Sequence, residues 1–137
     1  MTRRVLITGA AGFLGSHLCD YYVDRGDTVV GVDNLSTGLI ENLKHLKTKT
    51  KFSFVEADIT QDLPAAATEH CDIILNMASP ASPPHYQRLG LETLRVGSEG
   101  TLRMLQLARK HKARIFHAST SEVYGDPEVH PQPESYK

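Results

Sequence analysis

Three glycines, spaced every third residue, stand where an apolar run gives way to a helical pattern. Gly9, Gly12 and Gly15 lie within residues 8–15, directly after the apolar run at 5–7. Glycine tolerates positive φ and lets a phosphate approach the backbone closely. The following helix offers unpaired N–H groups and the positive end of its dipole. The spacing is not that of a P-loop, and no lysine follows to hold terminal phosphates, so the pattern predicts a pyrophosphate site of the dinucleotide-binding kind.

An acidic residue closes the next apolar run. Asp33 follows the glycines at close to the spacing at which a carboxylate accepts hydrogen bonds from the adenosine ribose hydroxyls. The same carboxylate would repel a 2′-phosphate, and residues 34–38 contain no arginine to attract one. The sequence therefore favours NAD over NADP as cofactor. The polar side chains within 34–38 either contact the same ribose and phosphate or form a simple turn.

Further polar residues follow the later strands of the expected sheet. Asp58 and Ile59 either flank the adenine or, through Asp58, cap the next helix. Residues 117–126 include three consecutive hydroxyls followed directly by the carboxyl of Glu122, which suit the polarisation of a sugar hydroxyl, although a serine-rich loop that caps its own backbone has the same composition. Residues 80–84 form either a rigid connector or a substrate wall. Arg95 is either an exposed helix residue or a contact for an acidic substrate.

The elements that must position these residues alternate regularly. Near-continuous apolar runs predict buried parallel strands at 4–8, 28–33, 52–57, 73–77 and 114–118. Helical patterns lie between them: one from residue 13 to Gly26, a short one near 42–46, one at 61–70, and a long one at 85–110 with a stripe of Leu91, Leu94, Leu102, Leu105 and Ala108. This alternation predicts an α/β fold, a doubly wound parallel sheet (Rossmann-like) of order 3-2-1-4-5, whose ligands bind at the carboxyl ends of the strands.

Composition excludes several other classes. The 137 residues carry a net charge of −1, which gives no electrostatic argument for nucleic acid or an anionic membrane. No apolar run reaches the length of a membrane span, no signal peptide is evident, and we expect a cytoplasmic protein. The seven histidines lack metal-ligand spacing, and Cys19 and Cys71 are expected to be reduced and structural. We expect a dinucleotide-binding domain at 1–125, and a loop at 126–137 that leads to a further part of a longer protein.

Taken together, these segments resemble the extended short-chain dehydrogenase/reductase family and, within it, the UDP-glucuronate decarboxylases. The resemblance covers essentially the whole chain. Residues 8–18 and 32–38 carry motifs that many nucleotide-sugar enzymes share, whereas 78–83 and 119–127, which leads to 130–136, are more specific to the decarboxylases. Ser121 precedes Glu122 where the related 4,6-dehydratases have Asp-Glu, and epimerases usually lack the glutamate. These differences favour the decarboxylases.

The resemblance implies a role for each matching residue. It places a catalytic hydroxyl at Thr120, an acid near the sugar at Glu122, and a basic residue near the nucleotide sugar at Arg95. The NAD-binding residues that the motifs and the resemblance predict together are Gly9, Gly12, Phe13, Leu14, Asp33, Asn34, Leu35, Thr37, Gly38, Asp58, Ile59, Met77, Ser79 and Ala118. The implied substrate is UDP-glucuronate, the implied cofactor is NAD, and the implied assembly of the full-length protein is a homodimer.

The implied reaction converts UDP-glucuronate to UDP-xylose. Oxidation at the sugar C4 places a keto group β to the C6 carboxylate, carbon dioxide leaves, and C4 is then reduced again, so that NAD is regenerated. An epimerase or 4,6-dehydratase of another nucleotide sugar, and a non-catalytic NAD-binding fragment, are the alternatives. The chain departs from the family pattern in three places: it lacks a Tyr-x-x-x-Lys pair, Gly97 replaces a common asparagine, and Asn76 stands where histidine is frequent. Without that pair we expect the chain alone to be inactive.

Overall fold

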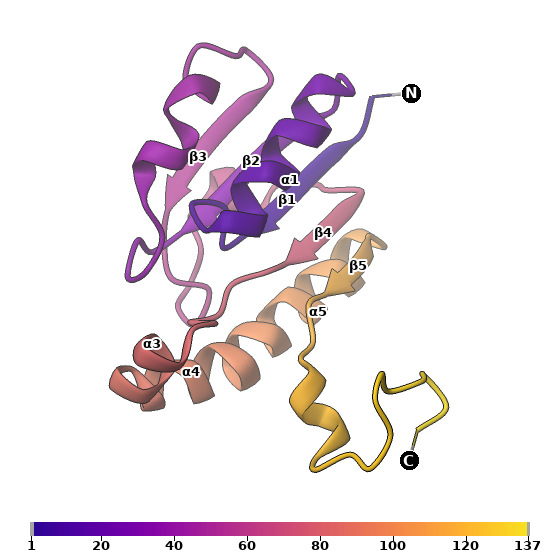
Figure 1. Cartoon of the computed structure of the whole chain (residues 1–137). Coiled ribbons are helices and arrows are strands. Elements are labelled where there is room, and N and C mark those ends of the chain that lie inside the picture. Colours follow the sequence, from indigo (N-terminus) through magenta and orange to yellow (C-terminus); the bar gives the residue numbers. More distant parts are fainter. Residues whose placement is uncertain (1, 137) are drawn as a thin grey trace.

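A five-stranded parallel sheet forms the centre of the molecule (Figure 1). The computed structural model describes residues 2–136. Its strands are β1 (Arg4–Thr8), β2 (Thr28–Asp33), β3 (Phe52–Glu56), β4 (Ile73–Asn76) and β5 (Arg114–His117). They are arranged in the order β3-β2-β1-β4-β5, and each neighbouring pair is parallel. The predicted fold class and strand order are confirmed, and the last three strands end one residue earlier than the apolar runs predict.

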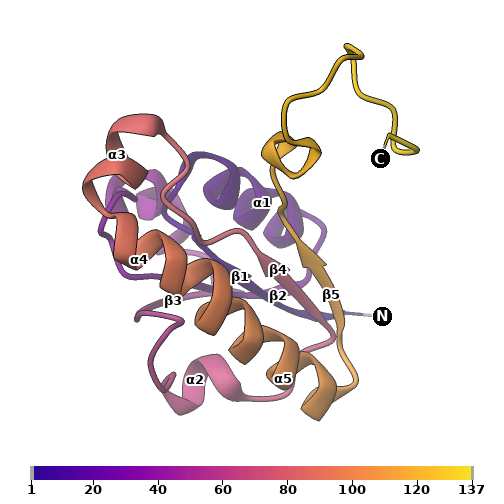
Figure 2. The same ribbon diagram turned by 90° about the horizontal axis from the view of Figure 1, so that it is seen from below.

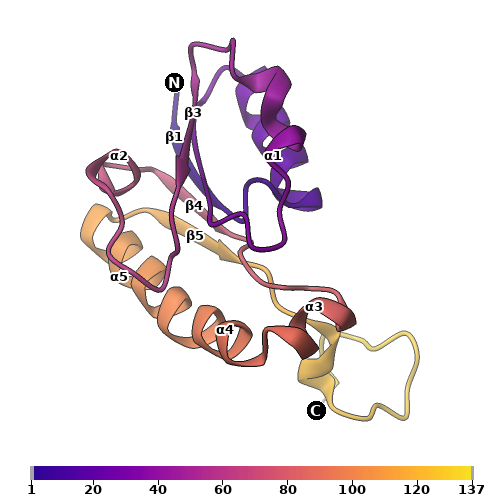
Figure 3. The same cartoon turned by 90° about the vertical axis from the view of Figure 1, so that its left-hand side faces the viewer.

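Helices cover both faces of this sheet, which explains why its strands are apolar throughout. Successive side chains point to opposite faces, so Val5 packs with one layer and Leu6 with the other. The first layer contains α1 (Phe13–Asp24) and the 3₁₀ helix η1 (Ile40–Leu46). The second contains α2 (Ala65–Thr68) and α5 (Thr101–His111). Figure 3 shows α1 on one side of the sheet and α2, α4 (Gly90–Arg95) and α5 on the other.

The two cysteines belong to these cores. Cys19 is on the buried face of α1, and Cys71 is buried in the opposite layer, so the two thiols are free and belong to the packed cores, as expected. Burial, helped by the negative charge of Asp20, raises the pKa of the Cys19 thiol to about 12. A thiol in this state is unreactive near neutral pH.

The long helix expected at residues 85–110 is divided into four pieces. They are α3 (Pro83–Arg88), α4 (Gly90–Arg95), the π-helical segment η2 (Val96–Gly100) and α5. The first of these pieces, α3, begins at Pro83, because proline is well suited to a first helical turn. The end of the rigid connector considered at residues 80–84 is therefore helical. The backbone leaves helical geometry at Leu89, with φ −112° and ψ 45°. The other expected helices are also shifted: η1 begins at residue 40, and α2 is only four residues long.

The leucines of the predicted stripe do not form the core of the second layer. Met104, Leu107 and Ala108 are buried against the sheet instead. The four stripe leucines remain exposed, with exposed fractions of 76% for Leu91, 69% for Leu94, 55% for Leu102 and 47% for Leu105. Of the predicted stripe, only Ala108 faces the sheet. Within residues 2–136, none of the helices has the length and apolar character needed to cross a membrane.

The chain after β5 leaves the body of the sheet. A short 3₁₀ helix, η3 (Ser121–Tyr124), follows the strand, and the remaining described residues form neither helix nor strand. Figures 1 and 2 show this segment extending away from the layers. The ring of Tyr136 lies edge-on to Tyr124, with ring centroids 6.0 Å apart. Lys137 lies outside the described residues.

Candidate functional site

The glycine-rich turn joins β1 to α1 in a conformation that requires glycine. Gly9 has φ +66°, and a Cβ there would lie 2.9 Å from the Cα of Ala78. Gly12 is the N-cap of α1, and within the described chain no side chain bonds to the helix at this position. The first N–H groups of α1 are therefore directed toward the turn without a side-chain cap. This arrangement is a ready anion-binding site.

The carboxylate of Asp33 is held against this turn. Its Oδ2 accepts a hydrogen bond from the backbone N–H of Ala11 at 3.0 Å, and its Oδ1 accepts one from Leu35 at 2.8 Å. Asp33 is 9% exposed and lies at the end of β2. Each oxygen has a further lone pair, so the carboxylate can also accept hydrogen bonds from a vicinal diol. This direct contact places the Asp33 carboxylate beside the glycine-rich turn.

A second acidic residue lies close to the end of β2. Asp58 follows β3 and accepts hydrogen bonds from the backbone N–H and the hydroxyl of Thr60, both at 2.8 Å, and from the amide of Asn34 at 3.2 Å. Burial opposes the charge on Asp58, but these hydrogen bonds outweigh it, and the pKa of the carboxyl lies below its ordinary value. Asp58 thus stabilises a turn rather than a helix N-terminus, and it connects that turn to the end of β2.

These residues line a cleft of about 1110 Å³ at the carboxyl ends of the strands. Of the residues predicted from the sequence, the cleft is lined by Gly9, Gly12, Phe13, Leu14, Asp33, Asn34, Thr37, Gly38, Asp58, Ile59, Met77, Ser79, Arg95, Ala118, Thr120 and Glu122. Leu35 is the exception, because its side chain packs against the core beneath α1. The backbone N–H of Leu35 still contributes, through its bond to Asp33.

Thr120 and Glu122 lie together at the start of η3. The Thr120 hydroxyl donates to Oε2 of Glu122 at 3.0 Å, and it accepts a hydrogen bond from the Glu122 backbone N–H at 3.3 Å. Thr120 is the N-cap of η3, so the loop caps its own backbone, and the same hydroxyl meets a carboxylate at the cleft. A carboxylate that accepts a hydrogen bond from a hydroxyl is suited to proton transfer.

Arg95 extends from the end of α4 toward solvent. Its Nε lies 3.9 Å from Oε1 of Glu99, and the two side chains are 66% and 56% exposed. An exposed pair at this distance holds the guanidinium only weakly. Arg95 therefore remains available to an acidic group that enters the cleft.

Among the residues to which the sequence pattern gave no role in the site, three polar ones at the ends of neighbouring strands are joined by hydrogen bonds at the cleft. Thr8 and Asn76 are buried at the ends of β1 and β4, and the Thr8 hydroxyl donates to Oδ1 of Asn76 at 2.8 Å. Nδ2 of Asn76 lies 3.1 Å from Nδ1 of His117 at the end of β5. The signal was present in the sequence, since each is a polar residue that closes an apolar run, but side-chain pairing across three strands needs the tertiary structure.

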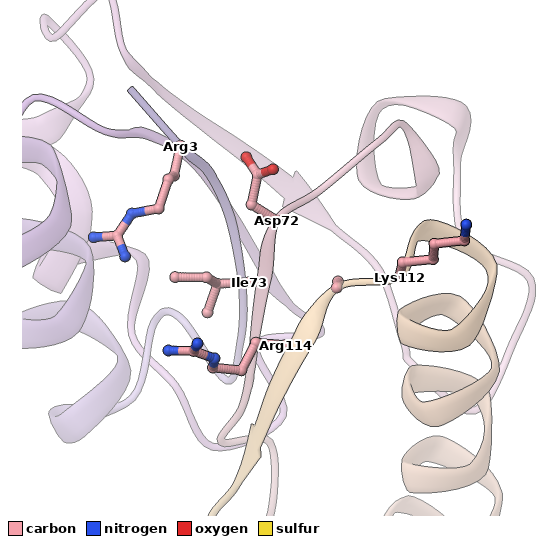
Figure 4. A pocket seen from close by; sticks show the side chains of 6 residues that line it. Arg3, Asp72, Ile73, Lys112 and Arg114 are labelled. Atoms are coloured by element: carbon pink, nitrogen blue, oxygen red, sulfur yellow. The ribbon is translucent and has the colours of Figure 1, made fainter. Parts of the chain in front are cut away.

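A smaller hollow lies at the opposite edge of the sheet. Its volume is about 500 Å³, and it is lined by Arg3, Asp72, Ile73, Lys112, Ala113 and Arg114 at the amino ends of the strands. Figure 4 shows the guanidinium groups of Arg3 and Arg114 on one side of it, while the side chain of Lys112 points away. Ligands of doubly wound sheets bind at the other edge. Among the described residues, no cluster of His, Cys, Asp or Glu is arranged to hold a metal ion.

Comparison with known proteins agrees with this geometry. The family model described as GDP-mannose 4,6 dehydratase matches residues 6–137. UDP-glucuronic acid decarboxylase 1 of Xenopus tropicalis is 47% identical over 134 residues, which cover 98% of this chain and 31% of that protein. The chain thus spans about a third of the length of this curated relative.

Solved structures share the fold. A crystal structure of a UDP-galactose 4-epimerase has a TM-score of 0.82 and 31% identity, with 97% of this chain and 43% of that chain covered. The Bordetella bronchiseptica enzyme WbmH, solved in complex with NAD⁺, has a TM-score of 0.83 and 27% identity, with 100% and 46% covered. The family match over nearly the whole sequence, the strand order and the glycine turn lead to one conclusion: the chain belongs to the GDP-mannose 4,6 dehydratase family of extended short-chain dehydrogenases/reductases.

Proposed function

We propose that this chain binds NAD in the cleft and forms the cofactor-binding part of a UDP-glucuronate decarboxylase. The observation that carries the NAD proposal is the contact between Asp33 and the backbone of Ala11. Ala11 directly precedes Gly12, the N-cap of α1, so this contact holds the carboxylate beside the N-terminus of the helix. One dinucleotide can then bind the carboxylate through its ribose and the helix N-terminus through its pyrophosphate. A 2′-phosphate would meet the same carboxylate, which argues against NADP.

The residues around the cleft fit an extended dinucleotide. The backbone of Gly12, Phe13 and Leu14 holds the pyrophosphate, and Asp33 with Asn34, Thr37 and Gly38 holds the adenosine ribose and its phosphate. Asp58 and Ile59 frame the adenine, while Met77, Ser79 and Ala118 line the way to the nicotinamide. Little space remains for side chains here, because a Cβ on Gly38 would lie 3.0 Å from Oδ2 of Asp33. Bound NAD supplies reversible hydride transfer.

The decarboxylase proposal is supported by the relatives and by the loop after β5. Thr120 and Glu122 lie at the end of the cleft where the nicotinamide is proposed to bind, and they already share a hydrogen bond. In this role Thr120 orients the sugar C4 hydroxyl, and Glu122 holds a proton beside it. Arg95 faces the acidic nucleotide sugar. Among the 137 residues, no tyrosine precedes a lysine by four positions, so decarboxylation is proposed for a longer protein that supplies this pair.

A 4-epimerase is the second candidate. It is favoured by the solved structures, since a UDP-galactose 4-epimerase shares the fold at 31% identity. Epimerisation and decarboxylation both begin with oxidation at C4, so the cofactor half would serve either. A protein that contains this chain, supplied with UDP-glucuronate and NAD⁺, is expected to release carbon dioxide and form UDP-xylose. Interconversion of UDP-glucose and UDP-galactose without release of carbon dioxide would establish the epimerase instead.

Calorimetric titration of this chain with NAD⁺ and with NADP⁺ tests cofactor binding directly. We expect NAD⁺ to bind and NADP⁺ to bind at least about tenfold more weakly, because the 2′-phosphate meets the charge of Asp33. Asp33→Asn should weaken NAD⁺ binding by about tenfold or more, since hydrogen bonds to a charged group contribute about 1.5–3 kcal/mol. Asp24→Asn removes an exposed carboxyl at the far end of α1 and serves as the matched control. Equal affinity of the Asp33 variant and the control would contradict the proposal.

A further inference from the structure

A buried chain of hydrogen bonds crosses three strands and ends on the wall of the cleft. It begins at the Thr8 hydroxyl, passes through the side-chain amide of Asn76 and reaches Nδ1 of His117. Thr8 is 0% exposed and Asn76 is 2% exposed, whereas His117 is exposed and lines the cleft. Each member therefore constrains the next, because water does not reach the first two.

The Thr8 hydroxyl has only one way to complete its hydrogen bonds. Its oxygen accepts from the backbone N–H groups of Met77 at 3.1 Å and Ala78 at 3.2 Å. Those two donors occupy both of its lone pairs. The single hydroxyl proton is left for Asn76, whose Oδ1 lies 2.8 Å away.

This assignment orients the Asn76 amide. With Oδ1 turned toward Thr8, Nδ2 donates to the Thr101 hydroxyl at 3.3 Å and to Nδ1 of His117 at 3.1 Å. The opposite orientation would place a third donor on the Thr8 oxygen and leave the hydroxyl proton without a partner. In a buried site such a loss costs about 1–3 kcal/mol. The orientation with the amide nitrogen toward His117 is the stable one.

A ring nitrogen that accepts a hydrogen bond carries no proton. We propose that this chain of hydrogen bonds holds His117 as the neutral Nε2–H tautomer, and that Nε2–H donates to an oxygen of NAD bound in the cleft. Nδ1 faces buried Asn76, so the edge of the ring that bears Nε2 is the one left toward the cleft. His117 thus positions the cofactor, and this contact, unlike the tautomer, rests on the proposed binding of NAD.

The tautomer is measured without any ligand. A long-range ¹H–¹⁵N correlation spectrum of the chain, recorded at about pH 8, distinguishes a protonated ring nitrogen from an unprotonated one. We expect Nδ1 of His117 to show the unprotonated shift and Nε2 the protonated shift. Asn76→Asp replaces the donor with a second acceptor and should reverse the two, whereas Thr8→Ser keeps the hydroxyl and should leave them unchanged. If Asn76→Asp does not fold, the wild-type spectrum alone decides, because an Nδ1–H tautomer or an even mixture overturns the proposal.

The ligand contact is tested by NAD⁺ titration of two His117 variants. His117→Leu removes the donor and should weaken NAD⁺ binding about fivefold, whereas His117→Gln places an amide N–H at a similar distance and should restore most of the affinity. Wild-type Nε2 should also shift on addition of NAD⁺. Equal affinity of the leucine variant and the wild type overturns the contact while leaving NAD binding intact. Failure of the wild type to bind NAD⁺ rejects the proposed function and the contact with it, and the tautomer is still decided in the free protein.

Discussion

Gly15 is the residue of the glycine-rich turn with the least room for a side chain. A Cβ there would lie 2.0 Å from the carbonyl oxygen of Gly9, whereas a Cβ on Gly12 would lie 3.2 Å from the same atom. Both glycines belong to a motif that the sequence associates with a phosphate site. At Gly15, however, the structure shows that glycine is first a packing requirement between α1 and the turn.

Replacement of Gly15 by alanine should therefore destabilise the fold strongly. Backbone must move to relieve the contact with Gly9, and overpacking of this kind costs about 1–3 kcal/mol or more. Gly12→Ala should cost clearly less, because the carbonyl of Gly9 needs to move by only a few tenths of an ångström. Urea unfolding followed by circular dichroism measures both free energies of unfolding. Equal losses in the two variants would show that the turn relaxes freely.

Among the secondary-structure elements, the π-helical segment η2 contains two glycines, Gly97 and Gly100, whose surroundings differ. A Cβ on Gly97 would meet open space, whereas a Cβ on Gly100 would lie 2.8 Å from Cδ1 of the buried Ile59. Gly100 thus allows the helix to approach Ile59, which also lines the cleft. Gly97 leaves space at the cleft wall.

Gly97→Ala should stabilise the chain by about 0.5–1 kcal/mol, because alanine loses less conformational entropy in a helix than glycine does. Gly100→Ala, three residues away, should destabilise it through the contact with Ile59. Thermal unfolding of the two variants beside the wild type gives the comparison. A lower melting temperature for Gly97→Ala would mean that the π-helical geometry itself depends on glycine.

The buried carboxylate of Asp27, in the turn between α1 and β2, binds Arg3, the residue that precedes β1. Burial opposes the charge of Asp27, but hydrogen bonds from the backbone and guanidinium of Arg3, with the charge of Arg25 nearby, outweigh it and lower the pKa of the carboxyl. A depressed pKa contributes stability that is present above the ordinary carboxyl pKa and is lost as pH falls through the folded-state value.

We therefore expect the stability of the chain to decrease as the pH falls below about 4, the ordinary range of an aspartate. Asp27→Asn removes this titration, so its unfolding free energy should be lower at pH 7 and should depend less on pH in the acidic range. Chemical denaturation at several pH values measures the difference. An unchanged slope in the variant would assign the acid sensitivity to other carboxyls, such as Asp58.

For the whole molecule, the exposed leucines of α4 and α5 are the most conspicuous feature. Leu91, Leu94, Leu102 and Leu105 together form an apolar face without a covering layer in the described chain. Apolar patches on protein surfaces are commonly sites of association. We propose that this face supports the homodimer expected for the full-length protein.

The isolated chain should accordingly self-associate as its concentration increases. A double variant, Leu94→Lys with Leu102→Lys, should shift light-scattering and size-exclusion profiles toward the monomer. Leu39→Lys changes a leucine that is 60% exposed, outside α4 and α5, and should have little effect. A sharp monomer peak for the wild type at high concentration would remove the basis of this proposal.

The sequence alone determined the strand order, the glycine turn and the acid at Asp33, because each follows from local pattern: apolar runs, glycine spacing and a polar residue at a strand end. Nearly all of the site residues that it predicted line the cleft, since parallel strands bring their carboxyl ends together, but they account for fewer than half of the lining residues. The break at Leu89 and the π-helical segment η2 were not evident from the continuous helical pattern and appear only in the tertiary structure, where Gly100 of η2 lies close against Ile59.

The buried connection from Thr8 to His117 also depended on tertiary structure. Its members are separated by 68 and 41 positions in the chain, and they meet only because β1, β4 and β5 are neighbours in the sheet. The direction of each hydrogen bond depends on which backbone N–H groups already occupy the Thr8 oxygen. Local pattern predicts which residues end the strands, but only the assembled sheet determines which of them pair and which nitrogen of His117 carries the proton.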